Sequence, residues 1–200
     1  MTNDSSSDAA PAWRPDFSEA VERALAKWPN VPACHGWLML DRRGRWRLGD
    51  GPITHPGAVA FLNAHYASDE HGAWYVQNGP QRAWVDLELA PWILSVEPDG
   101  SLRTQTCETL TATGEIYLTE HGDVLLATPR GLAAVSDRDL EAFARLFRTD
   151  DGSEVLERLA GLAPGAVLEL RDRAGRPRRV TAGNEDELLA RHRVQRRPRP

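Results

Sequence analysis

The sequence predicts a single compact α+β protein with two related halves, each with short hairpins of antiparallel sheet packed against helices. Three observations support this fold class. Apolar residues recur at helical spacing near both ends of the chain, and they alternate with polar residues through its middle. A faint internal similarity links two segments of the middle region. With 200 residues, 41% of them hydrophobic, the chain can bury a core of its own.

The clearest predicted element is a helix that Asp16 can cap and Pro29 ends. Its apolar residues fall at i, i+3, i+4, i+7, i+8 and i+11, which places them on one face: Phe17, Ala20, Val21, Ala24, Leu25 and Trp28. Further helices are expected where a proline or a capping residue precedes an apolar stripe, at Pro56, Ser136, Ser153 and Asn184.

Strands are expected between these helices, where apolar residues alternate with polar ones and turn residues separate the runs. The predicted strands are 37–41, 45–47, 73–77, 83–89, 92–96, 101–106, 115–119, 124–127, 132–135, 167–170 and 179–181. The run from Ala83 to Leu89 alternates most cleanly, so one of its faces should be core and the other solvated. The middle of the chain is therefore predicted to be mostly strand.

The internal similarity appears at an offset of 50 residues. It aligns His71-Gly72 with His121-Gly122, Ala83 with Ala133, and Val85 with Val135. Both copies predict a strand, a turn and a second strand. Duplicated halves with altered connections and a chance resemblance between two ordinary hairpins both remain open on this evidence.

These features divide the chain into four segments: a disordered N-terminal tail (1–14), a Trp-rich α+β half (15–110), a second α+β half (111–190) and a basic disordered tail (191–200). The first ten residues lack the basic start and apolar run of a signal peptide, and no stretch approaches the roughly 20 apolar residues of a membrane-spanning helix. We therefore expect a cytoplasmic protein without a membrane partner.

Charge is distributed unevenly along the chain. Residues 1–170 carry 14 basic and 25 acidic side chains, whereas residues 171–200 carry 10 arginines and 4 acidic side chains. We expect the basic tail and the acidic body to attract each other. A basic tail can also contact nucleic acid, which makes a nucleic-acid accessory protein a third hypothesis, but the absence of aromatic residues among the arginines disfavours it.

One string resembles a known family. The signature Trp-Tyr-x-Gln-Asn-Gly-Pro-Gln-Arg, at residues 74–82, resembles that of a proteobacterial family known only as a domain of unknown function, and the similarity runs from about Gly36 to Leu102. More remotely, the order of Trp37–Asp41, Gly44, Trp46 and the segments up to Pro91 is similar to a second uncharacterised bacterial family. That second resemblance implies repeated structural motifs and a role in signal transduction.

Residues that could support catalysis are few. His65, Asp69, Glu70 and His71 cluster where a helix is expected to meet a strand, but their spacing matches no metal-ligand motif. Asp86 and Glu88 lie two apart on one strand face, a separation that acid and base pairs use. An unrecognised hydrolase or metal-dependent enzyme using either set is the alternative hypothesis. We expect no cofactor and no metal.

The favoured hypothesis is a non-catalytic binding or regulatory module. All seven Trp residues lie in the first half of the chain, and a row of polar and aromatic residues follows one predicted hairpin. Aromatic side chains beside arginine and carboxylates are typical of binding hot spots. The predicted site, for an unidentified protein, peptide or small ligand, comprises Trp46, Gln77, Asn78, Gln81, Arg82, Trp84, Asp86 and Glu88. A face covered by the protein itself is the competing interpretation.

Overall fold

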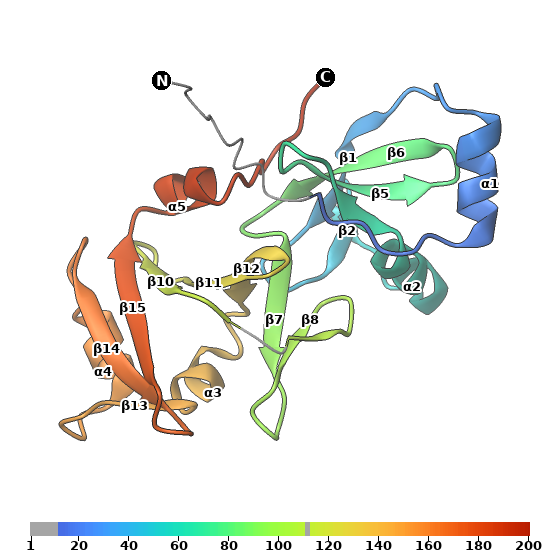
Figure 1. Ribbon diagram of the computed structural model, residues 1–200. Coiled ribbons are helices and arrows are strands. Elements are labelled where there is room, and N and C mark those ends of the chain that lie inside the picture. The colour runs from blue at the N-terminus through green and yellow to red at the C-terminus, as the bar shows by residue number, and fades with distance from the viewer. Residues whose placement is uncertain (1–11, 111–112) are drawn as a thin grey trace, which may run out of the picture.

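The computed structural model describes residues 12–110 and 113–200. The helices in these residues are short: α1 (Glu19–Lys27), α2 (Pro56–Ala64), α3 (Leu140–Ala144), α4 (Val155–Ala160) and α5 (Glu185–Arg191). Figure 1 shows two sheets, one flanked by α1 and α2 and the other by α3 and α4, with α5 and the C-terminal end of the chain running above them. Strands therefore dominate the architecture, and helices cover their faces.

The first sheet has six strands in the order β3-β2-β1-β6-β5-β4. They are β1 (Cys34–Leu40), β2 (Trp46–Leu48), β3 (Gly51–Pro52), β4 (Tyr66–Ser68), β5 (Trp74–Asn78) and β6 (Gln81–Leu87). Neighbouring strands are antiparallel except β1 and β6, which are parallel. Helix α2 is inserted between β3 and β4, and its expected start at Pro56 is confirmed.

The second sheet has nine strands in the order β13-β14-β15-β10-β11-β12-β7-β8-β9. They are β7 (Trp92–Val96), β8 (Leu102–Thr104), β9 (Thr109–Leu110), β10 (Ile116–Thr119), β11 (Val124–Thr128), β12 (Gly131–Val135), β13 (Phe147–Arg148), β14 (Val167–Asp172) and β15 (Pro177–Gly183). The pairs β12/β7 and β10/β15 are parallel. The sheets are thus mixed and not wholly antiparallel as expected.

The same six-stranded arrangement occurs in both sheets. Strands β7 to β12 follow the order of β1 to β6, and each set contains one parallel pair, Leu38 beside Val85 in the first and Leu94 beside Val135 in the second. The β4/β5 and β10/β11 pairs also share the same register: Tyr66 lies opposite Val76, and Ile116, 50 residues later, lies opposite Leu126. Strands β7 to β9 belong to the second sheet. The sequence analysis had assigned residues 92–110, which contain these strands, to the first half of the protein.

One hydrophobic core connects the two sheets. Its buried side chains include Leu40, Trp46 and Tyr66 from the first sheet and Leu94 and Leu125 from the second. Aromatic rings converge at the centre of this core, as the T-shaped contact of Trp74 with Trp92 at 5.1 Å between centroids illustrates. A smaller cluster lies on the other face of the first sheet, under α1, and contains Phe17, Val21, Ala67 and Tyr75.

Described residues of both predicted disordered tails form specific contacts with the two sheets. Residues 1–11 of the expected N-terminal tail lie outside the described residues, but Trp13 exchanges two hydrogen bonds with Ser68 and packs edge-on against Trp92. The expected disordered tail at 191–200 lies along β6, where the Arg196 carbonyl accepts from the Leu87 N–H at 2.8 Å, and Pro198 is buried. Backbone pairing and ion pairs supply the order that composition alone did not predict.

Candidate functional site

The sequence analysis placed Trp46 in the binding site, and this prediction was wrong because Trp46 is buried. Its side chain is 1% exposed, and its indole Nε1 donates to Asn63 Oδ1 at 2.7 Å. Trp46 lies opposite Leu40 in the sheet and contacts Tyr66, so it belongs to the core side, whereas Trp84 contacts Tyr75 on the side that α1 covers. The two tryptophans therefore face opposite sides of the sheet.

Trp84 and Arg82 lie on the face that the sequence proposed for binding, but the protein itself covers much of it. Trp84 is half-buried, packs beside Tyr75 and stacks on His35 at 5.8 Å between centroids. Arg82 is exposed, with its guanidinium 4.6 Å from the Tyr75 ring centroid. This arrangement leaves the Arg82 edge accessible and buries part of the Trp84 indole.

The polar residues at the β5–β6 hairpin tip have different roles. Gln77 is 1% exposed, and its amide nitrogen donates to the carbonyls of Gly79 and Gln81, so it stabilises its own turn. Gln81 donates to the Pro32 carbonyl at 2.9 Å, which ties the hairpin to the start of β1. Asn78 is exposed. Gln77 is therefore structural, while Asn78 and Gln81 lie at the surface of a groove described below.

The carboxylates Asp86 and Glu88 already have cationic partners. Both Asp86 oxygens accept from Arg199, at 3.0 and 3.2 Å. Glu88 accepts from the backbone N–H and the Nε of Arg42, at 3.1 and 3.0 Å. The two groups are thus arranged as anchors for other parts of the chain and not as an acid and base pair.

The histidines of the other candidate site do not converge. His65 is buried, and its ring nitrogens lie 3.0 Å from Ser18 Oγ and 2.8 Å from the Phe61 carbonyl. His71 is exposed, and Asp69 accepts from the backbone N–H groups of His71 and Ala73 to form the turn. Among residues 12–110 and 113–200, no group of three or more His, Cys, Asp or Glu side chains could hold a metal ion.

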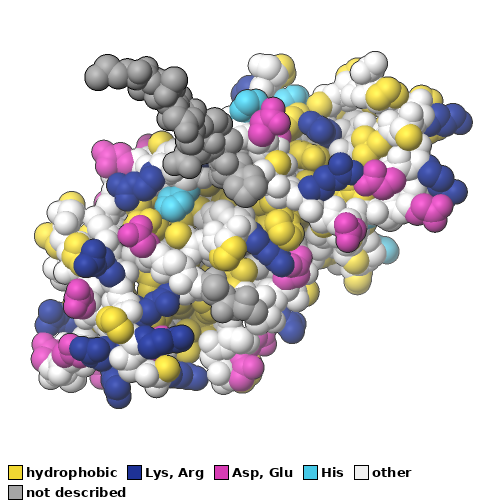
Figure 2. Space-filling model, in the orientation of Figure 1, with side chains coloured by type: hydrophobic (Ala, Val, Ile, Leu, Met, Phe, Trp, Pro, Cys, Tyr) yellow, Lys and Arg dark blue, Asp and Glu magenta, His cyan; other side chains and the backbone are white. Residues whose placement is uncertain are grey.

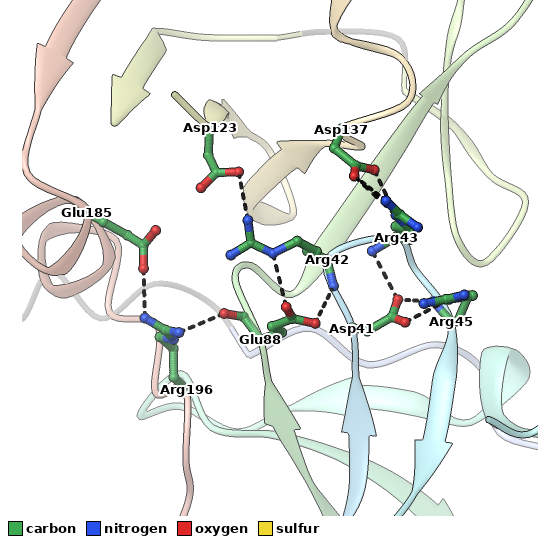
Figure 3. Close-up of polar contacts among 9 residues, drawn as sticks. All are labelled: Asp41, Arg42, Arg43, Arg45, Glu88, Asp123, Asp137, Glu185 and Arg196. Carbon is green, nitrogen blue, oxygen red and sulfur yellow. Dashed lines mark hydrogen bonds and ion pairs between the residues drawn. The ribbon is translucent and has the colours of Figure 1, made fainter. Parts of the chain in front are cut away.

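A network of charges joins the two sheets and the C-terminal segment (Figure 3). Arg42 bridges Glu88 and Asp123, and Arg196 donates to Glu185 at 2.7 Å and to the Glu88 carbonyl at 2.7 Å. A second contact joins Arg43 in the β1–β2 turn to Asp137, which follows β12. Hydrogen bonds from Arg43 lower the pKa of the Asp137 carboxyl. The tail-to-body contacts are the bond of Arg196 to the Glu88 carbonyl and the ion pair of Arg199 with Asp86, which agree with the expected attraction between the basic tail and the acidic body.

An apolar groove in the first sheet is the best candidate for a binding site. It has a volume of about 460 Å³ and lies between the sheet and α2, with Asn78 and Gln81 among its lining residues. Trp37 and Leu48, which also line it, are 69% and 57% exposed. Helix α2 beside it is largely apolar, yet none of its residues is buried. Exposed apolar surface of this kind is typical of interaction sites.

Local backbone geometry explains why Trp37 points outward. The pairing of β1 with β6 shifts between Cys34 and Leu38, and Gly36 has a φ of +72°. Such a bulge re-aims the side chains that follow it. The sequence alone did not single out Trp37, because residues 37–40 are all apolar and their pattern does not say which face is covered. The glycine before Trp37 was the available signal.

The surface around these elements carries both signs of charge. Figure 2 shows basic and acidic side chains interspersed over the visible face, with apolar side chains between them. Within the described residues, no helix has the length and apolar character needed to cross a membrane.

The fold is that of a β-rich α+β protein with two mixed sheets, and the candidate groove lies on the first of them. The chain belongs to the DUF2944 family, described as "Protein of unknown function (DUF2946)", whose model matches residues 17–199. Membership of a family of unknown function agrees with the resemblance seen in the sequence. No curated protein matches the chain.

One solved structure is similar in part. It is the crystal structure of a DUF1285 family protein from Silicibacter pomeroyi DSS-3, determined at 2.50 Å resolution. The two chains are 15% identical, with a TM-score of 0.48, and the comparison covers 70% of this chain and 82% of that chain.

Proposed function

We propose that this protein is a non-catalytic binding and regulatory module that holds an apolar segment of a protein partner in the groove beside Trp37. The observation that carries the proposal is the exposure of Trp37 and Leu48 next to an apolar groove of about 460 Å³. Leaving an indole in water is costly, and tryptophan is enriched at the energetic centres of interfaces. The groove replaces the Trp46 and Trp84 row as the proposed site and retains Asn78 and Gln81.

A protein segment suits this groove better than a small molecule does. Apolar side chains surround it on one side from the sheet and on the other from α2, where Ala58, Phe61 and Leu62 line it. Asn78 and Gln81 at its end can donate hydrogen bonds to a peptide backbone. The occupant expected here is an amphipathic segment with one or two large apolar anchors.

The repeated strand order supports a further part of the proposal. We infer that the units β1–β6 and β7–β12 are copies of one structural motif, because they share the strand order, the position of the parallel pair and the register of the β4/β5 and β10/β11 pairs. A role in signal transduction is consistent with a module that binds through one copy and is held to the other by the charges of Figure 3. Location in the cytoplasm belongs to the same proposal, and the free thiols of Cys34 and Cys107 accord with a reducing compartment.

The proposal is tested by selecting peptides from a displayed random library on the purified protein and measuring their affinity by fluorescence polarisation. Selected peptides should carry large apolar anchors, and Trp37→Ala or Leu48→Glu should weaken binding by at least about tenfold, or about 1.4 kcal/mol. Trp28→Ala is the matched control, because Trp28 is an exposed indole that does not line the groove.

Two results would contradict the proposal. The first is equal affinity of the wild type and Trp37→Ala for every selected peptide. The peptides would then bind outside the groove beside Trp37. The second is a dimer in sedimentation experiments that Leu48→Glu dissociates, because the groove would then be an interface between copies of this chain.

A further inference from the structure

A second cavity lies in the other sheet, far from Trp37 in the sequence. Its volume is about 530 Å³, and it lies between the β10–β11 hairpin, the end of β15 and helices α3 and α4. The lining is largely apolar and includes Leu118, Phe143, Leu156 and Leu159. Leu156 is 43% exposed although it belongs to this apolar lining. Cavities of this size and polarity commonly bind ligands.

The repeated strand order identifies the counterpart of this cavity in the first sheet. The β10–β11 turn at Gly122 corresponds to the β4–β5 turn at Gly72, 50 residues earlier, and the two glycines have φ values of +84° and +81°. In both turns the glycine N–H donates back to the residue three positions before it, Asp69 or Thr119. The two turns are therefore closely similar in backbone conformation.

In the first sheet, this position is occupied by the chain's own C-terminal segment. The Gln195 N–H donates to the Gly72 carbonyl at 3.1 Å, and the Gln195 side chain donates to the His71 carbonyl at 3.1 Å. Gln195 also forms a parallel bridge with Ala73. A Cβ on Gly72 would lie 1.6 Å from the Arg193 carbonyl oxygen, so the segment passes directly over the glycine. Val194 packs against the core beside it.

In the second sheet, the same position is open among the described residues. A Cβ on Gly122 would meet no described atom within 4 Å. Asp123, the counterpart of Ala73, forms no β-bridge with any described segment. The turn at Gly122 therefore has the geometry that accepts an extended segment at Gly72, and the apolar cavity lies next to it.

Charge around the cavity favours a basic occupant. Glu120 lines it, and the first turn of α5 adds Asp186 and Glu187, whereas Glu185 in the same turn is paired with Arg196. Hydrogen bonds from backbone N–H groups, of Glu120 itself and of Glu185, lower the pKa of the Glu120 carboxyl and keep it ionised. The segment at Gly72 is itself basic, with Arg193 before the valine and Arg196 and Arg197 after Gln195. Opposite charges accelerate encounter and favour the matching partner.

We propose that the turn at Gly122 and the adjoining cavity bind an extended basic peptide of a partner protein, with a branched aliphatic side chain in the cavity. The peptide backbone would donate to the Gly122 carbonyl as Gln195 donates to that of Gly72. This site is separate from the groove beside Trp37, so either proposal can fail alone.

The probe is a fluorescein-labelled synthetic peptide with the sequence of residues 191–197, Arg-His-Arg-Val-Gln-Arg-Arg, titrated against the full chain. Leu156→Arg places a cation in the cavity and should weaken binding by at least about tenfold. Val167→Arg is the matched control, because Val167 is 50% exposed in the same sheet but does not line the cavity. This control variant and Trp37→Ala should bind like the wild type.

Four outcomes would overturn the proposal. One is the absence of binding to the wild-type chain. Another is equal affinity of the peptide for Leu156→Arg and for the wild type. The peptide would then bind outside the cavity, in place of the C-terminal segment at Gly72. A loss of binding in Trp37→Ala would assign the peptide to the other groove. Equal binding of a peptide with aspartate in place of the valine would show that charge attraction acts without the cavity.

Discussion

Arg42 and Asp123 are 81 residues apart in the sequence and lie 3.4 Å apart, from Nη1 to Oδ1. Arg42 belongs to the β1–β2 turn and Asp123 directly follows the turn between β10 and β11, so their contact links the two sheets (Figure 3). Burial lowers the pKa of Arg42, but Asp123 and Glu88 outweigh it and leave the pKa raised. The Asp123 side chain is only 12% exposed, and Oδ2 has no hydrogen-bond partner among the described residues.

Removing the Arg42 charge should therefore destabilise the protein. Arg42→Gln leaves the carboxylate of Asp123 poorly solvated, and the free energy of unfolding should fall by about 1–3 kcal/mol in urea titrations. Arg43→Gln is the control, since the Arg43 and Asp137 side chains are 37% and 35% exposed and such pairs contribute about 0–1 kcal/mol. Asp123→Asn should reduce the effect of Arg42→Gln, and additive effects would contradict the coupling.

The tryptophans should separate into structural and surface residues. Trp46→Ala removes a buried indole and its bond to Asn63, so the free energy of unfolding should fall by about 3–5 kcal/mol. Trp37→Ala should change it by less than about 0.5 kcal/mol, as surface substitutions do. Thermal and urea unfolding measure both. Equal losses would show that Trp37 is also part of the core.

Equivalent glycines should respond differently to the same substitution. Gly72→Ala and Gly122→Ala both place a side chain at positive φ, which costs roughly 1–2 kcal/mol. Only at Gly72 does the Cβ also collide with the Arg193 carbonyl, so this variant should be the less stable and should release the C-terminal segment to proteases. Equal stability and equal proteolysis of the two variants would contradict the described path of residues 193–195.

Stability should fall in mild acid because of His192. Burial, and then the nearby Arg191 charge, lower the pKa of His192 from its usual 6.5, so the folded state disfavours the protonated ring. The unfolded chain binds this proton more readily, and stability therefore decreases as the pH falls from about 6.5 toward the lower folded-state pKa. Above that window the contribution is constant. His192→Gln should flatten this part of the stability profile, and an unchanged profile would exclude His192 as its cause.

Much of the local structure follows from the sequence. The periodicity of residues 17–28 predicts a helix close to α1, and Asn184 caps α5 by accepting from the Glu187 N–H. The hairpin at residues 74–87 also lies where alternation places it. These features depend on neighbouring residues, and local pattern and capping chemistry are visible along a single chain.

The candidate site was harder to predict, because the sequence does not reveal which face of a strand is covered. Trp46 and Trp84 belong to opposite sides of one sheet, and the row predicted for binding contacts α1 and the C-terminal segment. Trp37 points outward because of a bulge that shifts the pairing of β1. A one-residue change of register moves a side chain to the other face, and register is set by partners distant in the chain.

The sequence by itself determined the strand-rich middle of the chain, the approximate positions of the helices, the Asn184 cap of α5, the concentration of tryptophan in the first half and the attraction between an acidic body and a basic end. Only the tertiary structure decided that β1 and β7 pair in parallel with β6 and β12, that Arg196 and Arg199 hold the C-terminal segment in place, and that Trp37 is exposed. The physical reason is that pairing, burial and charge compensation are relations between segments far apart, whereas propensity and periodicity act within a few residues.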